Sequence, residues 1–74
     1  MSAMRILDHT GDTTISWDPD KPDEVAIARK AFEEAQAKRY LAYKIDPGGN
    51  KGEIVRSFDP RAEELILAPP LRGG

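Results

Sequence analysis

The chain has 74 residues, of which 39% are hydrophobic and 32% charged, and its net charge is −2. This length allows one domain with a small core, and the composition is too apolar for a disordered chain. Because the Lys and Arg residues are scattered and no apolar run could span a membrane, we expect a cytoplasmic monomer with neither nucleic acid nor membrane as a partner.

Two strands joined by a turn are predicted at the start of the chain. Met4–Asp8 alternates apolar and polar residues, which is typical of a half-buried strand. The second segment is β-branched and aromatic, and its alternation places three side chains on one face: Thr13, Ile15 and Trp17. Gly11 lies between the two segments and can supply a positive φ. We therefore expect a hairpin.

A helix is predicted over Val25–Lys38. Its apolar residues recur at three- and four-residue steps and form one stripe: Val25, Ala28, Phe32 and Ala35. The small alanines allow the helix to lie close against a sheet, with Phe32 as its main anchor. In the preceding loop, Asp20 is the expected N-cap and Pro22 suits the first turn.

A second hairpin and a last strand are predicted after the helix. The two strands of the hairpin are predicted at Tyr40–Ile45 and Glu53–Phe58, on either side of a glycine-rich turn. In the first of them, Leu41, Tyr43 and Ile45 lie on one face. These glycines do not form a phosphate loop, because neither Lys-Ser nor Lys-Thr follows them and no helix begins there. Asp59–Glu63 can form one helical turn capped by Asp59, before the apolar strand Leu65–Ala68.

The end of the chain differs from the rest in its backbone chemistry. Pro69 and Pro70 fix φ and donate no N–H, so they favour an extended segment that leaves the sheet. Gly73 and Gly74 have no side chains and could enter a narrow channel in another protein. We therefore divide the chain into a domain, residues 1–68, and a flexible C-terminal tail, residues 69–74.

This tail resembles the ends of ubiquitin-like β-grasp proteins. The last four residues resemble the terminus of ubiquitin, and Pro69-Pro70 followed by two residues and Gly-Gly resembles the terminus of the molybdopterin-synthase small subunit. The predicted element order also resembles theirs. The resemblance implies an α+β fold of β-grasp type, ββαββ(β), in which one helix packs across a mixed sheet and the first and last strands are central and parallel. The connection Lys38-Arg39 and the segment before the last strand are both shorter than in ubiquitin.

The resemblance implies a protein modifier. An activating enzyme would use ATP to adenylate the Gly74 carboxylate, and a conjugating enzyme would join it to an amine of a target protein, from which an isopeptidase could release it. Gly73 and Gly74 would be the reactive end. The activating enzyme would recognise three preceding residues, Pro70, Leu71 and Arg72, with the Arg72 side chain paired to a carboxylate.

Two other functions remain open from the sequence. In a sulfur carrier, sulfide or persulfide would attack the same adenylate and give a Gly74 thiocarboxylate; Pro69-Pro70 favours this reading, whereas Leu71-Arg72 favours the modifier. In a protein-binding module of the same fold, the tail would never be activated.

No catalytic residues are expected in the chain itself. It contains no cysteine, and its one histidine, His9, lies in the first predicted turn without a second histidine beside it. Disulfides, thiolate zinc sites and a Ser–His or Cys–His pair are therefore not expected. A chain this small also has little room for a substrate cleft. We predict a non-enzyme that holds neither a metal nor a cofactor, the ATP being used by its partner.

Overall fold

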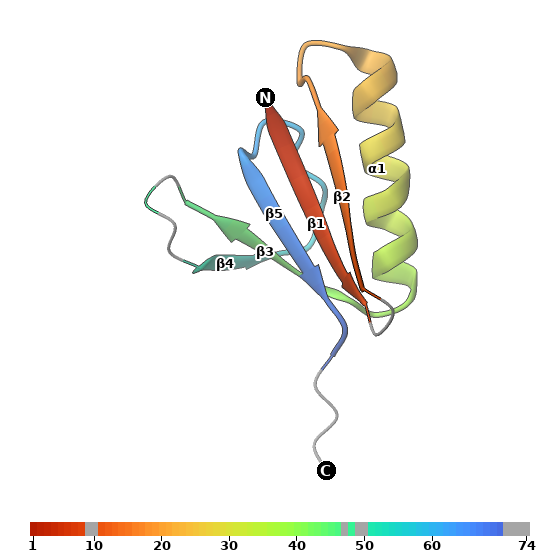
Figure 1. Ribbon diagram of the computed structural model, residues 1–74, viewed down its shortest axis with the longest axis vertical. Coiled ribbons are helices and arrows are strands. Elements are labelled where there is room, and N and C mark those ends of the chain that lie inside the picture. The colour runs from red at the N-terminus through yellow and green to blue at the C-terminus, as the bar shows by residue number, and fades with distance from the viewer. Residues whose placement is uncertain (9–10, 47, 49–50, 71–74) are drawn as a thin grey trace.

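The computed structural model describes residues 1–8, 11–46, 48 and 51–70, with the backbone alone at residue 51. These residues form an α+β fold with one helix and a mixed sheet of five strands (Figure 1). The elements in chain order are β1 (Ser2–Asp8), β2 (Gly11–Trp17), α1 (Pro22–Ala37), β3 (Leu41–Ile45), β4 (Lys51–Val55) and β5 (Glu64–Ala68).

The first and last strands lie together in the middle of the sheet. The strand order is β2-β1-β5-β3-β4, and β1 and β5 are parallel while the other three pairs are antiparallel. The expected parallel central pair is therefore confirmed. In its register Met4 lies opposite Leu65 and Ile6 opposite Leu67. Since Met4 and both leucines are fully buried, this pair forms the centre of the core.

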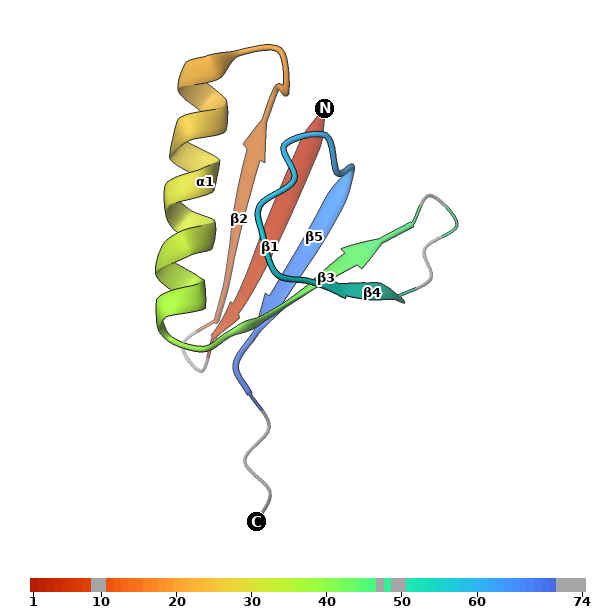
Figure 2. The ribbon, with the colours of Figure 1, turned by 180° about the vertical axis from the view of Figure 1, so that it is seen from behind.

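The helix covers the core face of the sheet and runs alongside β2 (Figure 2). Its buried residues are Ala28, Phe32 and Ala35, as the apolar stripe predicts. Phe32 and Leu67 are fully buried, and Ile6 and Ile15 pack half-buried against the same cluster. The core therefore joins the helix to the two central strands and the first hairpin.

The start of α1 corrects the predicted cap. The N-cap residue is Lys21, whose side chain makes no capping hydrogen bond, and Pro22 is the first helical residue. Asp20 is held in the preceding turn instead, because its N–H donates to Asp18 Oδ1 at 2.9 Å. Glu24, in the first turn of the helix, accepts a hydrogen bond from the Asp18 N–H at 2.9 Å. Asp18 therefore organises this entry, which the propensity of Asp20 for caps did not indicate.

The helix ends in a Schellman motif with an unusual residue. Tyr40 N–H donates to the Ala35 carbonyl and Arg39 N–H to the Gln36 carbonyl. Arg39 occupies the left-handed position with φ of 67°. Glycine is the usual residue there because a side chain makes this conformation strained.

The second hairpin differs from the prediction in extent, since its strands are Leu41–Ile45 and Lys51–Val55. β4 ends at Val55, so Phe58 lies in the connection to β5 and not in a strand. Its ring lies 5.2 Å from that of Trp17 and 5.6 Å from that of Phe32, centroid to centroid. The chain leaves the sheet after Val55 and thereby brings Phe58 into this aromatic cluster. Aromatic pairs of this kind stabilise a fold by more than the burial of their surface area alone.

The connection from Phe58 to β5 contains one turn, which is held by hydrogen bonds within it and by one from Trp17. Ala62 N–H donates to the Asp59 carbonyl, and Arg61 N–H donates to Asp59 Oδ1 at 3.0 Å, so Asp59 caps the turn as expected. The Trp17 indole N–H donates to the Pro60 carbonyl at 2.9 Å. Ala62 is buried, which places this turn against the core.

Candidate functional site at the end of β5

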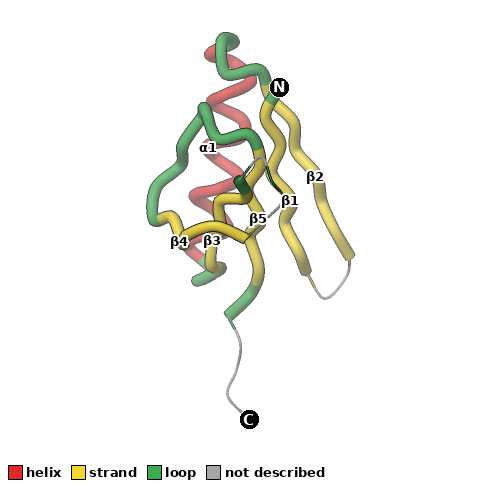
Figure 3. Tube along the Cα trace, turned by 90° about the vertical axis from the view of Figure 1, so that its left-hand side faces the viewer, coloured by secondary structure: helices red, strands yellow, loops and turns green. Residues whose placement is uncertain are grey.

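The site predicted from the sequence begins where β5 ends. Ala68 is the last residue of β5 and pairs with Leu41, the first residue of β3. Pro69 is half-buried and Pro70 is exposed. Figures 1 and 3 show the chain leaving the sheet here, at the end of the domain that also holds the last turn of α1. The strand that bears the tail is hydrogen-bonded on both edges, to β1 and β3.

Of the five residues predicted to act in the tail, the structure describes one. Pro70 is exposed, and its role in recognition by an activating enzyme stays a prediction. The other four, Leu71, Arg72, Gly73 and Gly74, lie outside the described residues. The flexibility predicted for residues 69–74 therefore stays a prediction.

Next to this exit lies an apolar surface that the sequence analysis did not identify. Tyr43 of β3 is paired with Ile54 of β4 and with Ile66 of β5, so these three side chains share a face. Leu41, two residues before Tyr43, lies on the same face. We call this surface, Leu41, Tyr43, Ile54 and Ile66, the open sheet face.

The open sheet face is directed away from the helix. Ala42, which alternates with Leu41 and Tyr43, is the residue of β3 that is buried in the core. Ile54 is 53% exposed and Leu41 is 38% exposed. The predicted grouping of Leu41, Tyr43 and Ile45 on one face is confirmed by this alternation. An alternating pattern alone does not say which face meets the helix, because both faces of β3 contain apolar residues.

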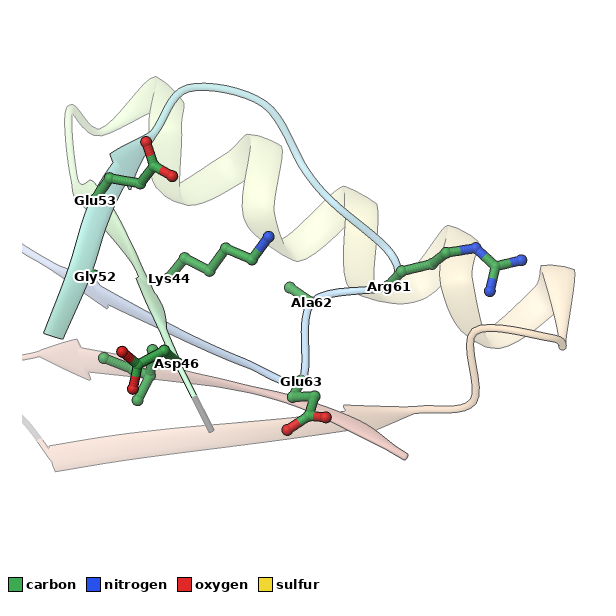
Figure 4. A pocket seen from close by; sticks show the side chains of 8 residues that line it. Lys44, Asp46, Gly52, Glu53, Arg61, Ala62 and Glu63 are labelled. Atoms are coloured by element: carbon green, nitrogen blue, oxygen red, sulfur yellow. The ribbon is translucent and has the colours of Figure 1, made fainter. Parts of the chain in front are cut away.

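A cavity of about 420 Å³ lies between the β3–β4 hairpin and the segment before β5 (Figure 4). Lys44 reaches across it, and its Nζ lies 3.3 Å from Asp59 Oδ2. The ends of Glu53, Arg61 and Glu63 point in different directions and do not converge on one point (Figure 4). Gly52 also lines the cavity. Glycine is required at this position for packing, because an added Cβ would collide with the Lys44 carbonyl oxygen. This arrangement supplies no set of convergent polar groups for a ligand.

Neither a metal cluster nor a membrane helix is present in the part of the chain that the structure describes. No group of three or more His, Cys, Asp or Glu side chains is placed there to hold a metal ion. In the same residues, no helix is long and apolar enough to cross a bilayer. His9 lies outside the described residues.

Comparison of the chain with models of protein families, with characterised proteins and with solved structures found no match.

Proposed function

We propose that the chain is a ubiquitin-like protein modifier with a β-grasp fold, whose Gly74 carboxylate is activated by an ATP-dependent enzyme and joined to amines of target proteins. The observation that carries the proposal is the position of β5. This strand is central, is paired on both edges and leads directly into an exposed Pro70. A tail on such a strand can be pulled into another protein's active site without disturbing the domain.

The strand order supports the finer assignment of the fold. The resemblance to β-grasp proteins implies a parallel central pair made of the first and last strands, with one helix across a face of the sheet. In this chain β1 and β5 form such a pair, with β2 beside β1 and the β3–β4 hairpin beside β5. The short connection after α1 is a departure from ubiquitin that the fold accommodates, since Arg39 turns the chain within a single residue.

The chemistry requires activation because a carboxylate is a poor acyl donor. The Gly74 carboxylate oxygen would attack the α-phosphorus of ATP, releasing pyrophosphate and leaving an acyl adenylate. The nitrogen of a target amine would then attack the acyl carbon, and AMP would leave as the amide bond forms. The protein itself would be a substrate and not an enzyme, and it would work in the cytoplasm, where ATP is available.

The partners would bind at two adjacent places. The activating enzyme would read Pro70, Leu71 and Arg72 and accept only backbone at Gly73 and Gly74. The open sheet face begins beside the tail, because Leu41 is paired with Ala68. This apolar surface would be the contact site for the conjugating enzyme, the isopeptidase and the proteins that bind the modifier. Their apolar side chains could cover it.

A sulfur carrier is the second candidate, favoured by the two prolines that directly follow β5. In that case sulfide would attack the adenylate, AMP would leave, and Gly74 would end in a thiocarboxylate. A protein-binding module is the third candidate, favoured by the open sheet face alone.

The proposal is tested with an N-terminally tagged chain incubated with ATP, magnesium and a lysate of its source. We expect ATP-dependent conjugates of higher mass, absent for Gly74→Ala, whose added methyl group would block a channel shaped for backbone. Arg72→Ala should reduce their amount, and Glu33→Ala, on the exposed side of the helix, should leave it unchanged. Conjugates that persist in Gly74→Ala would contradict the proposal.

A further inference from the structure

The tail leaves the sheet where two neighbouring segments both lack a backbone donor for further pairing. Ala68, the last residue of β5, is paired antiparallel with the first residue of β3, and continuing this register by two residues places Arg39 opposite Pro70. The N–H groups of Arg39 and Tyr40 donate to carbonyls in the last turn of α1, and the two prolines have no N–H. The ladder therefore ends at Ala68, and the tail and the α1–β3 connection lie at the same end of the domain (Figure 1).

Arg39, in this connection, has a backbone conformation that its own Cβ makes costly. Its φ is 67°, the one positive φ of a residue other than glycine in the part of the chain that the structure describes. Glycine would make the same turn and the same hydrogen bond without that cost. Strained residues of this kind are concentrated at active sites, ligand clamps and switch regions. The side chain of Arg39 is therefore a candidate for a functional role.

The domain itself makes little use of the Arg39 side chain. This side chain is exposed, and its guanidinium has no ion pair or hydrogen bond with another residue that the structure describes. A cation at the carboxyl end of α1 is favourable for the helix dipole, but Lys38, the C-cap residue, already supplies one. Neither pairing within the domain nor the helix dipole therefore accounts for an arginine at this position.

The position of Arg39 suits recognition of the tail and not the chemistry at its end. Gly74 is four residues beyond Pro70, so a tail extended into an active site would carry its carboxylate about 14 Å from the domain. Arg72 is two residues beyond Pro70, at most about 7 Å along the chain. A partner that takes up the tail would thus meet two guanidinium groups, one on the domain and one on the tail. Because a guanidinium binds a carboxylate through two parallel hydrogen bonds, the matching surface would be acidic.

We propose that Arg39 is a specificity-determining residue for the enzyme that activates the tail. It would bind a carboxylate at the rim of the channel that admits the tail, and so orient the domain before Gly74 enters. The inference rests on the proposed function, and it applies to a modifier and to a sulfur carrier alike, since both require adenylation. Arg39 would be a positioning residue and would take no part in making or breaking bonds.

The test measures the rate of formation of the ATP-dependent product, conjugate or thiocarboxylate, as the concentration of the N-terminally tagged chain is varied in a lysate of its source. Arg39→Gly should raise the apparent KM about tenfold and leave the maximum rate unchanged, since the chemistry at Gly74 is unaltered. Arg39→Lys should restore part of the loss, because an ammonium keeps the charge without the planar pair of hydrogen bonds. Arg39→Gly should melt at or above the wild-type temperature, so unfolding cannot explain its raised KM.

Lys30→Gln is the matched control, because Lys30 is an exposed cation about two turns before the end of α1. Its apparent KM should stay within about twofold of wild type. Ionic strength supplies a second readout that a purely structural role would not move. The apparent KM of wild type should rise with salt more steeply than that of Arg39→Gly, because salt screens the charge pair that only wild type can form.

Three results would overturn this proposal and leave the proposed function intact. These are an unchanged KM in Arg39→Gly, an equal increase of KM in Lys30→Gln, and a loss in Arg39→Gly that falls on the maximum rate alone. Absence of any ATP-dependent product from wild type would instead overturn the proposed function, and this inference with it.

Discussion

Single residues of this small domain carry large shares of its stability, and Phe32 is the leading example. It is fully buried, lies 5.6 Å from the Phe58 ring and is flanked on the helix by the alanines Ala28 and Ala35. Small neighbours cannot expand to fill the space that a truncated ring would leave. The helix is therefore attached to the sheet mainly through this side chain.

Phe32→Ala should lower the free energy of unfolding by about 3–5 kcal/mol, a large fraction of the stability of a domain of this size. Urea denaturation followed by circular dichroism measures it. Ile27→Ala is the matched control on the same helix, and because Ile27 is exposed the change should stay within about 0.5 kcal/mol. Equal losses for the two variants would show that the helix packs differently.

Arg39 is the residue whose replacement should stabilise the protein. Its positive φ of 67° is strained for any residue with a Cβ, and its N–H already makes the Schellman hydrogen bond that glycine would retain. Arg39→Gly should raise the unfolding free energy by about 1 kcal/mol. Lys38→Gly, one residue earlier at a φ of −88°, should lower it, since glycine there only adds freedom to the unfolded chain. A loss of stability in Arg39→Gly would contradict this account of the helix end.

At the scale of elements, the helix and the first hairpin could be predicted because their patterns are local. The stripe that contains Ala28 and Phe32 has helical spacing, and Gly11, predicted to allow a positive φ, has a φ of 132°. The prediction of Asp20 as the N-cap was wrong. Asp18 and Asp20 are both suitable turn residues, and only the hydrogen bonds of the folded loop distinguish their roles.

The connection between β4 and β5 could not be predicted in the same way. Phe58 continues an alternating pattern, but its contacts with Trp17 and Phe32 come from distant parts of the chain. Such contacts are set by tertiary packing, which can override strand propensity. The open sheet face was missed for a related reason: alternation groups side chains without indicating which group meets the helix.

Trp17 should hold this connection in place. Trp17→Phe removes the indole N–H that donates to the Pro60 carbonyl, and we expect a loss of about 1–3 kcal/mol, since this carbonyl is left without its principal donor. Amide hydrogen exchange should show where the loss falls. The Ala62 N–H, bonded to Asp59, should exchange faster by a larger factor than the amides of β1. Uniform acceleration over the domain would argue against a local role.

For the whole molecule, the arrangement separates stability from the proposed chemistry. The core is formed by residues up to Leu67, and β5 is paired on both edges before the chain reaches Pro69. Changes at Gly74 should therefore leave the melting temperature unaltered. The tail residues of the proposed site were predicted from composition and resemblance and stay a prediction, whereas the surface beside them is defined by the register of β3, β4 and β5.

The proposal also requires that the mature protein ends at Gly74. The intact mass of the protein isolated from its source should correspond to such an end. Removing Gly74 would shorten the reach of the tail by about 3.5 Å, so we expect the shortened chain to fold normally and to fail in activation.

The most direct test of the central claim is the intact mass of the chain after incubation with ATP, magnesium and a lysate of its source. A modifier should gain the mass of a target protein less one water, in wild type and not in Gly74→Ala. A gain equal to the difference between sulfur and oxygen would identify a sulfur carrier instead. An unchanged mass in every condition, with full activity in the chain that lacks Gly74, would contradict an acyl-donor role and leave a binding module.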